Sequence, residues 1–246
     1  MFYESINIPL WRALREIRGK AVLDVGCGTG ALGELLQQNG NTVEGITWSA
    51  EEARIAAARL AKVYVFDLNS AERHRTELRR SYDMLVFADV LEHLLAPRGT
   101  LAALLPLLSP GGKVYVSLPN IACFHVRLGL LCGGFEMSKS GGALDETHLH
   151  FYTLKTAREL LRGADLEIEK VDFVPAPSVW FYQAFLKKAS SEPPERMAGR
   201  KDFRFYERWV YPLEHLVASA WRTLLAQQFV FVCRSAAEKP GGAAAG

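Results

Sequence analysis

The sequence lacks a long apolar run and a strong net charge. Arg127 and Arg222 interrupt its most apolar stretches, so no segment reaches the 18 residues that a membrane-spanning helix requires. The first residues carry Glu4 and no apolar core, so we expect no signal peptide. A net charge of +2 gives no electrostatic footprint of a nucleic-acid partner, and we expect none.

Cysteine is also scarce. The four cysteines have no paired spacing, which argues against disulfides and against a zinc site; they are Cys27, Cys123, Cys132 and Cys233. Reduced thiols predict a cytoplasmic protein.

What the sequence does have is a glycine-rich turn after an apolar segment. Residues 21–25 read as a strand with Asp24 inside it, and Gly26, Gly28 and Gly30 follow at alternate positions before a helix. A buried carboxylate is unfavourable without a partner or a function. Glycines allow the backbone to approach a ligand, and a helix N-terminus favours an anionic group. The turn therefore predicts a nucleotide-type cofactor site at the carboxyl edge of a parallel sheet.

Two cofactor classes compete for this turn. Gly28, Gly30 and Gly33 match the dinucleotide fingerprint G-x-G-x-x-G, which would predict NAD. That fingerprint expects an acid after the second strand, where Thr47 stands, and needs none inside the first strand. Asp24 with its alternate glycines instead resembles the first motif of the class I S-adenosylmethionine-dependent methyltransferases. The resemblance implies an enzyme whose acid and glycines hold the methionine end of S-adenosylmethionine.

The resemblance extends over most of residues 20–175. Residues 42–49 resemble the family's second motif, in which an acid grips the ribose; Thr47 stands there, and a hydroxyl binds more weakly than a carboxylate. Asp67 and Leu68 resemble the pair that meets the adenine ring. The cofactor-binding residues implied in this way are Asp24, Gly26, Cys27, Gly28, Gly30, Thr47, Trp48, Asp67, Leu68 and Asp89.

A polar loop follows the fourth apolar strand. Its residues 89–93, Asp-Val-Leu-Glu-His, resemble the corresponding loop of the ubiquinone-type O-methyltransferases. The N-P-P-Y sequence of adenine and glutamine N-methyltransferases is absent, which points away from DNA and amide nitrogen as substrates. His93 is a candidate general base because histidine is the side chain that ordinarily exchanges a proton near neutral pH. A role in packing or hydrogen bonding of the loop is the alternative.

A second polar cluster lies beyond the fifth strand. Asp145, Thr147, His148 and Phe151 fit a pattern that resembles a bacterial methyltransferase branch found in polysaccharide and lipid-linked glycan pathways. His148 is therefore a second candidate base, and a structural bridge from Asp145 is the alternative. His148 and His150 would share a face of an extended segment, but no further ligand has clear spacing, so we expect no metal.

Apolar segments alternate with helical ones along most of the chain. The predicted strands are residues 21–25, 42–47, 63–66, 83–89, 113–118, 166–174 and 228–233. Helices are predicted over 1–19, after Gly30, from Ser49, over 71–80, after Pro97 and over 154–161. This order predicts an α/β protein with a doubly wound, mostly parallel, seven-stranded sheet of Rossmann-like type.

Two segments interrupt the expected single domain of residues 1–236. Residues 120–150 contain two pairs of adjacent glycines, which predict hinges around a loop or lid. Residues 178–224 are rich in aromatic and basic side chains, and we expect a helical, aromatic cap insertion in this otherwise irregular region. The same region could contact a lipid headgroup surface. Residues 237–246 read as a disordered tail.

Together these patterns predict an S-adenosylmethionine-dependent methyltransferase. We expect in-line methyl transfer to an oxygen of a small-molecule, glycan or lipid-linked acceptor, with a histidine as general base. A cofactor-binding relative without catalytic activity, with residues 178–224 as an interaction surface, is one alternative. An NAD-dependent oxidoreductase is another.

Overall fold

The computed structural model describes residues 8–78, 81–139, 141–175 and 201–237. Seven strands form one sheet in the order β3-β2-β1-β4-β5-β7-β6. The strands are β1 (Ala21–Val25), β2 (Thr42–Thr47), β3 (Lys62–Val65), β4 (Tyr82–Ala88), β5 (Leu108–Pro119), β6 (Leu166–Pro175) and β7 (Ala226–Ser235). The predicted α/β class and the seven strands are confirmed.

The sheet is mixed. Strands β3, β2, β1, β4 and β5 pair in parallel, whereas β7 is antiparallel to both β5 and β6. Strand β6 thus ends at the same edge as the parallel strands, and the chain returns from that edge through β7. The return from the carboxyl edge explains why β7 runs against its neighbours, and it inserts a late segment between two earlier ones.

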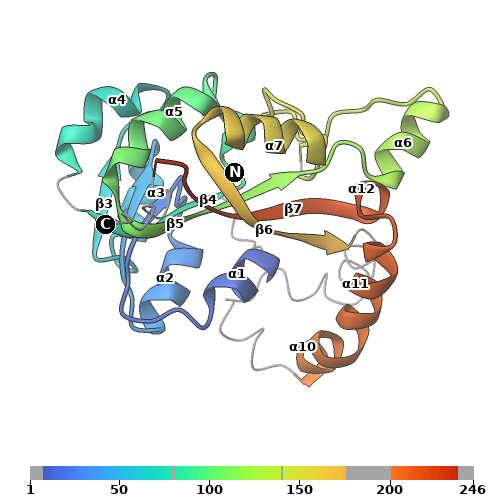
Figure 1. Ribbon diagram of the computed structural model, residues 1–246, viewed down its shortest axis with the longest axis horizontal. Helices are drawn as coiled ribbons and strands as arrows, with labels where there is room; N and C mark the ends of the chain where they lie inside the picture. Colours follow the sequence, from blue (N-terminus) through green and yellow to red (C-terminus); the bar gives the residue numbers. More distant parts are fainter. Residues whose placement is uncertain (1–7, 79–80, 140, 176–200, 238–246) are drawn as a thin grey trace, which may run out of the picture.

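Helices cover both faces of the sheet (Figure 1). Those of the described residues are α1 (Ile8–Leu14), α2 (Ala31–Gln38), α3 (Ala50–Ala56), α4 (Ala71–His74), α5 (Pro97–Leu104), α6 (Phe124–Leu131), α7 (Leu154–Gly163), α10 (Lys201–Phe205), α11 (Tyr211–Ser219) and α12 (Arg222–Leu225). Helices α5 and α7 bury Leu101 and Ala157 in one apolar layer, while α1 and α2 bury Leu10 and Leu36 in the other. The result is a three-layer arrangement whose strand ends are free to form a site.

Local sequence explains where several helices begin. Thr153 starts α7, because its hydroxyl accepts a hydrogen bond from the backbone N–H of Thr156 at 3.2 Å. Ser49 starts α3 in the same way, accepting from the N–H of Glu52 at 3.3 Å. Gly30 starts α2 from the left-handed region, with φ of 83°. These three helix starts agree with the sequence prediction.

Two expectations about the elements need correction. Strand β5 begins at Leu108 rather than at residue 113, because Tyr82 pairs with Leu108 and a bulge then carries the chain to the pairing of Met84 with Lys113. Residues 124–131 of the predicted lid form the helix α6. From residue 201 onward the residues of the predicted cap are helical, in α10, a π-helical turn at Tyr206–Val210, α11 and α12.

Residues 178–200 of the predicted cap and 238–246 of the predicted tail lie outside the described residues. Among the helices that are described, none combines the length and the apolar character that crossing a membrane requires.

Candidate functional site

A cleft of about 1150 Å³ lies at the carboxyl ends of the parallel strands. It is where a doubly wound sheet collects its ligands. The sequence-predicted residues that line it are Asp24, Gly26, Cys27, Gly28, Thr47, Trp48, Asp67, Leu68, Asp89, His93 and His148. Gly30 does not line the cleft; it packs against Leu60 and Ala56 at the start of α2.

The glycine turn after β1 joins a buried acid to an open backbone. Asp24 is 2% exposed, and burial raises the pKa of its carboxyl to about 7, although the backbone N–H of Gly33 opposes the shift. Within the described part of the chain, its Oδ2 has no hydrogen-bond partner. An added Cβ at Gly28 would meet no protein atom within 4 Å. The turn thus combines a buried, unpartnered carboxyl oxygen with bare backbone that lines the cleft.

The two glycines of this turn predict different mutant phenotypes. Gly28→Ala is expected to abolish binding of S-adenosylhomocysteine, because the added methyl group takes up cleft space that the backbone shares with the ligand. It is expected to lower the free energy of unfolding by only about 1 kcal/mol, because the φ of Gly28, 52°, is left-handed but no protein atom lies within 4 Å of the new Cβ. Gly26→Ala is expected to destabilise the fold by about 3 kcal/mol, because the new Cβ would lie 2.5 Å from Val90 Cγ2. Chemical denaturation and calorimetry measure both effects. Equal loss of stability in the two variants would contradict this distinction.

The end of β2 carries Thr47, which is 2% exposed. Its hydroxyl donates to Oε2 of Glu52 at 2.7 Å and accepts from the N–H of Ser49 at 3.3 Å. The Thr47 proton therefore goes to Glu52, and Glu52 itself lines the cleft. The next residue, Trp48, lines the cleft with 79% of its surface exposed. Sequence reasoning missed Glu52 because the run Ser49-Ala50-Glu51-Glu52 fits a capping box, which explains an acid at this position by helix capping alone.

The acid after β3 closes a local turn. Asp67 Oδ1 accepts from the backbone N–H and from the side-chain amide of Asn69, each at 2.9 Å. Asp67 is exposed and lines the cleft, and the adjacent Leu68 is buried beneath it. The pair therefore contributes an exposed carboxylate and a buried apolar side chain to the lining of the cleft.

Asp89 lies at the end of β4 in an unusual backbone conformation, with φ of 54°. Its Oδ1 accepts from the hydroxyl of Ser117 at 2.8 Å and from the side-chain amide of Gln228. Ser117 belongs to β5 and Gln228 to β7, so three neighbouring strands fix this carboxylate. No local sequence pattern signals Gln228, because its position depends on the antiparallel insertion of β7.

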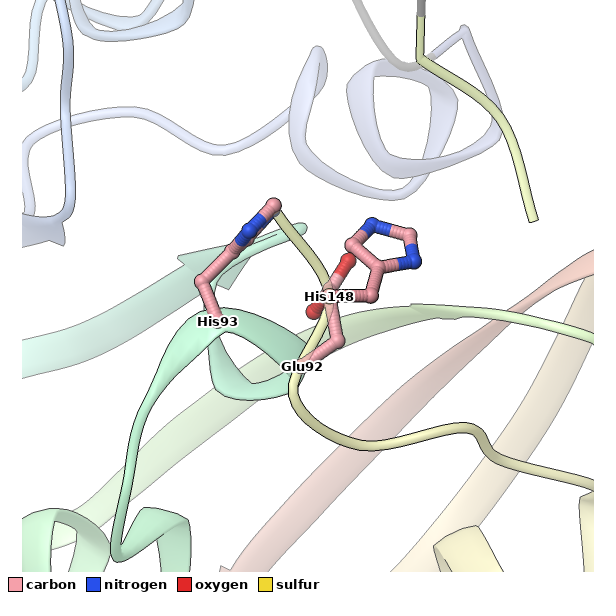
Figure 2. Close-up of side chains that lie close together, drawn as sticks. All are labelled: Glu92, His93 and His148. Atoms are coloured by element: carbon pink, nitrogen blue, oxygen red, sulfur yellow. The ribbon is translucent and has the colours of Figure 1, made fainter. Parts of the chain in front are cut away.

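Glu92, His93 and His148 gather beyond β4 (Figure 2). The rings of the two histidines make an edge contact with 4.7 Å between centroids. Glu92 is 1% exposed, its two carboxylate oxygens have no hydrogen-bond partner among the described residues, and burial raises its pKa well above the ordinary value. Each of the three residues offers an atom within 4.8 Å of the others, a set that could hold a metal ion. Sequence spacing did not single out Glu92 as a third ligand.

A hydrogen-bonded relay holds His93. The hydroxyl of Thr147 donates to Asp145 Oδ1 at 2.6 Å and lies 3.0 Å from Nδ1 of His93. The carbonyl oxygen of Thr147 lies 3.3 Å from the same nitrogen. Because a carbonyl only accepts, and the hydroxyl has already given its proton to Asp145, Nδ1 of His93 must carry the hydrogen. In the neutral ring, Nε2 is then the nitrogen with a free lone pair.

His148 is held in place by the backbone around it. The N–H groups of Leu149 and His150 donate to the carbonyl oxygen of Glu92 at 2.8 and 3.1 Å. The pKa of His148 is lowered by burial and by the neighbouring His93. These contacts bring both candidate bases to one place, and the closure of residues 120–150 over an acceptor stays a prediction.

Comparison with known proteins identifies the class. The profile of a family described as a methyltransferase domain matches residues 8–171, well over half of the chain, so the chain belongs to that family. With the fold and the glycine-lined cleft, it is a member of the class I S-adenosylmethionine-dependent methyltransferases, and S-adenosylmethionine is its cofactor. The cleft fits that cofactor, because Gly28 leaves room for a ligand and Asp24 offers an unpartnered oxygen.

Individual relatives are similar over part of the chain. The ubiquinone biosynthesis O-methyltransferase of Shewanella sp. (strain ANA-3) is 36% identical over 107 residues, which cover 42% of this chain and 45% of that protein. That of Aeromonas salmonicida (strain A449) is 34% identical over 105 residues, with 42% and 44% covered. The chain therefore matches less than half of the length of these relatives.

Solved structures share the fold. A SAM dependent methyltransferase from Archaeoglobus fulgidus superposes with a TM-score of 0.57 at 15% identity, covering 92% of this chain and 90% of that one. The magnesium protoporphyrin IX methyltransferase from Synechocystis PCC 6803 with bound SAH gives 0.51 at 19% identity, with 68% and 73% covered.

Proposed function

We propose that this protein transfers the methyl group of S-adenosylmethionine to a hydroxyl oxygen, with His93 as the general base. The observation that carries the proposal is the relay from Asp145 through Thr147 to His93, which leaves Nε2 ready to accept a proton. The partial similarity to ubiquinone biosynthesis O-methyltransferases supports oxygen as the acceptor atom. His148, in edge contact with His93, is the second candidate for the same task.

Each part of the cleft has a separate task in this proposal. When bound, the cofactor supplies a methyl group made electrophilic by a positively charged sulfur. Asp24 and the glycine turn hold its methionine end, and Asp67 with Leu68 meets its adenine ring. His93 removes the proton of the acceptor hydroxyl, and the proton comes to rest on Nε2. The protein thus contributes alignment and proton removal.

The acceptor that we propose is a small molecule, a glycan or a lipid-linked compound. The lipid-linked class is favoured by helix α11, which exposes Leu213, Leu216 and Val217 by 62%, 67% and 56%. Trp209 and Trp221, before and after α11, are also more than half exposed. An apolar helix face of this kind suits peripheral contact with a lipid surface. The four cysteines are all free, which supports the cytoplasm as the compartment.

Calorimetry and an acceptor screen test the proposal. S-adenosylmethionine and S-adenosylhomocysteine are expected to bind in the micromolar range, and NAD is expected not to bind. The screen follows a labelled methyl group into soluble phenols, sugars and lipid-linked acceptors in vesicles. Binding of NAD with no binding of either sulfur cofactor would overturn the cofactor assignment.

The screen also separates the proposal from two others. Cofactor binding without transfer to any acceptor class would favour a non-catalytic relative. A labelled product that forms only when a divalent metal is present, and is lost with a chelator, would assign Glu92, His93 and His148 to a metal instead of a base.

A further inference from the structure

The carboxylate of Glu52 lies beside Thr47, at the end of β2, where the sequence itself has no acid. Glu52 lies in the first turn of α3, and Thr47 lies at the end of β2. The 2.7 Å hydrogen bond between them brings the carboxylate to the end of the strand. An acid five residues further along the chain therefore reaches the position that Thr47 leaves uncharged.

At the start of α3, the Glu52 carboxylate does not make the hydrogen bond of a complete capping box. In a complete capping box, the acid at the third helical position bonds back to the N–H of the capping residue. Here Ser49 accepts from the N–H of Glu52, but the N–H of Ser49 donates to Thr47 Oγ1 at 3.3 Å instead. Only half of the box forms, so the Glu52 side chain is left to face the cleft that it lines.

We propose that Glu52 binds the two ribose hydroxyls of S-adenosylmethionine and that Thr47 orients it. Thr47 donates to Oε2, and within the described residues Oε1 accepts no hydrogen bond. A carboxylate offers two oxygens with several lone pairs, which suits a pair of adjacent hydroxyl donors. A hydrogen bond to an ionised acceptor is also stronger than one to a neutral hydroxyl.

This assignment changes the role of Thr47. Its single proton is given to Glu52, so it cannot donate to a ribose, and it is 2% exposed. Thr47 is a positioning residue, and Glu52 is the group that touches the ligand. The inference rests on S-adenosylmethionine as the cofactor and makes no use of the identity of the acceptor.

Calorimetric titration with S-adenosylhomocysteine and with its 2′,3′-dideoxy analogue tests the assignment. Glu52→Gln keeps the shape of the side chain and an acceptor for Thr47. It is expected to weaken binding of S-adenosylhomocysteine about tenfold or more. For the analogue, which lacks both hydroxyls, the variant and the wild type are expected to agree within about twofold. Glu72→Gln, which removes the same charge from α4, is the control for long-range electrostatics.

The outcomes distinguish this inference from the proposed function. Unchanged affinity of Glu52→Gln for S-adenosylhomocysteine, or equal weakening for both ligands, would overturn the role of Glu52 and leave the cofactor intact. Failure of the wild-type protein to bind S-adenosylhomocysteine would instead overturn the cofactor. Circular dichroism of the variant confirms that any loss of binding occurs in a folded protein.

Discussion

Asp24→Asn is expected to stabilise the ligand-free protein at pH 8 while weakening S-adenosylhomocysteine binding 10- to 100-fold. The pKa of Asp24 is about 7 in the folded protein and 3.8 without its surroundings. Between these values the folded state keeps a proton that the unfolded state has lost, so the free energy of unfolding falls as the pH rises. The wild type is expected to lose about 3 kcal/mol between pH 5 and pH 8 from this group, and Asp24→Asn is not.

Chemical denaturation at the two pH values measures the difference. Glu92, whose pKa is also raised, is present in both proteins, so its contribution cancels in the comparison. The Cys27 thiol faces the same carboxylate, and burial together with the nearby charges raises its pKa, which keeps it neutral over this range. Asp165→Asn, at an exposed carboxylate, is the control. Parallel pH profiles for the wild type and Asp24→Asn would refute the buried, proton-holding state of Asp24.

His93→Ala is expected to lower kcat by about 10²–10⁴-fold without changing the affinity for S-adenosylhomocysteine. The reason is that Nε2 of His93 is the proton acceptor that the relay through Thr147 prepares. Part of the activity is expected to return at high pH, where the acceptor hydroxyl ionises by itself. Initial rates with labelled cofactor, combined with calorimetry, separate the catalytic effect from binding.

Matched variants make the assignment specific. His125→Ala and His215→Ala are expected to keep near-normal turnover, because His125 contacts Cys123 and His215 bonds to Asp172, away from the cleft. A loss confined to His148→Ala would move the role to that residue. If His93→Ala and His148→Ala both turn over normally, the protein acts by positioning an acceptor that needs no base.

The fold and much of the cleft could be predicted because their signals are local. The glycine turn after Asp24 is a short local pattern. Its glycines meet two physical requirements, a φ above zero and space for a ligand, within a few consecutive residues. Apolar strands that alternate with helices along the chain also predict a parallel sheet, in which the carboxyl ends of the strands lie at one edge. These signals can be recognised without knowledge of any contact between residues distant in sequence.

The features that could not be predicted depend on side-chain reach or on contacts distant in sequence. The Glu52 side chain accepts from Thr47 because the N–H of Ser49, its partner in a complete capping box, donates to Thr47 instead. Gln228 meets Asp89 across 139 residues, and the tautomer of His93 is set by Thr147, 54 residues away. Helix α6 was mistaken for a loop because its flanking glycines are stronger signals than its weak amphipathic pattern.

The position of β7 between two earlier strands has a consequence for how the protein is made. A ribosome releases residues 226–235 after every other strand of the sheet, yet β7 lies between β5 and β6. Asn120 at the end of β5 bonds to the carbonyl oxygens of Thr223 and Ala226, so it too waits for this segment. Until then the edge of β5 is open to other strands. A growing chain therefore gains its Asp89–Gln228 contact only after the six other strands of the sheet have been synthesised.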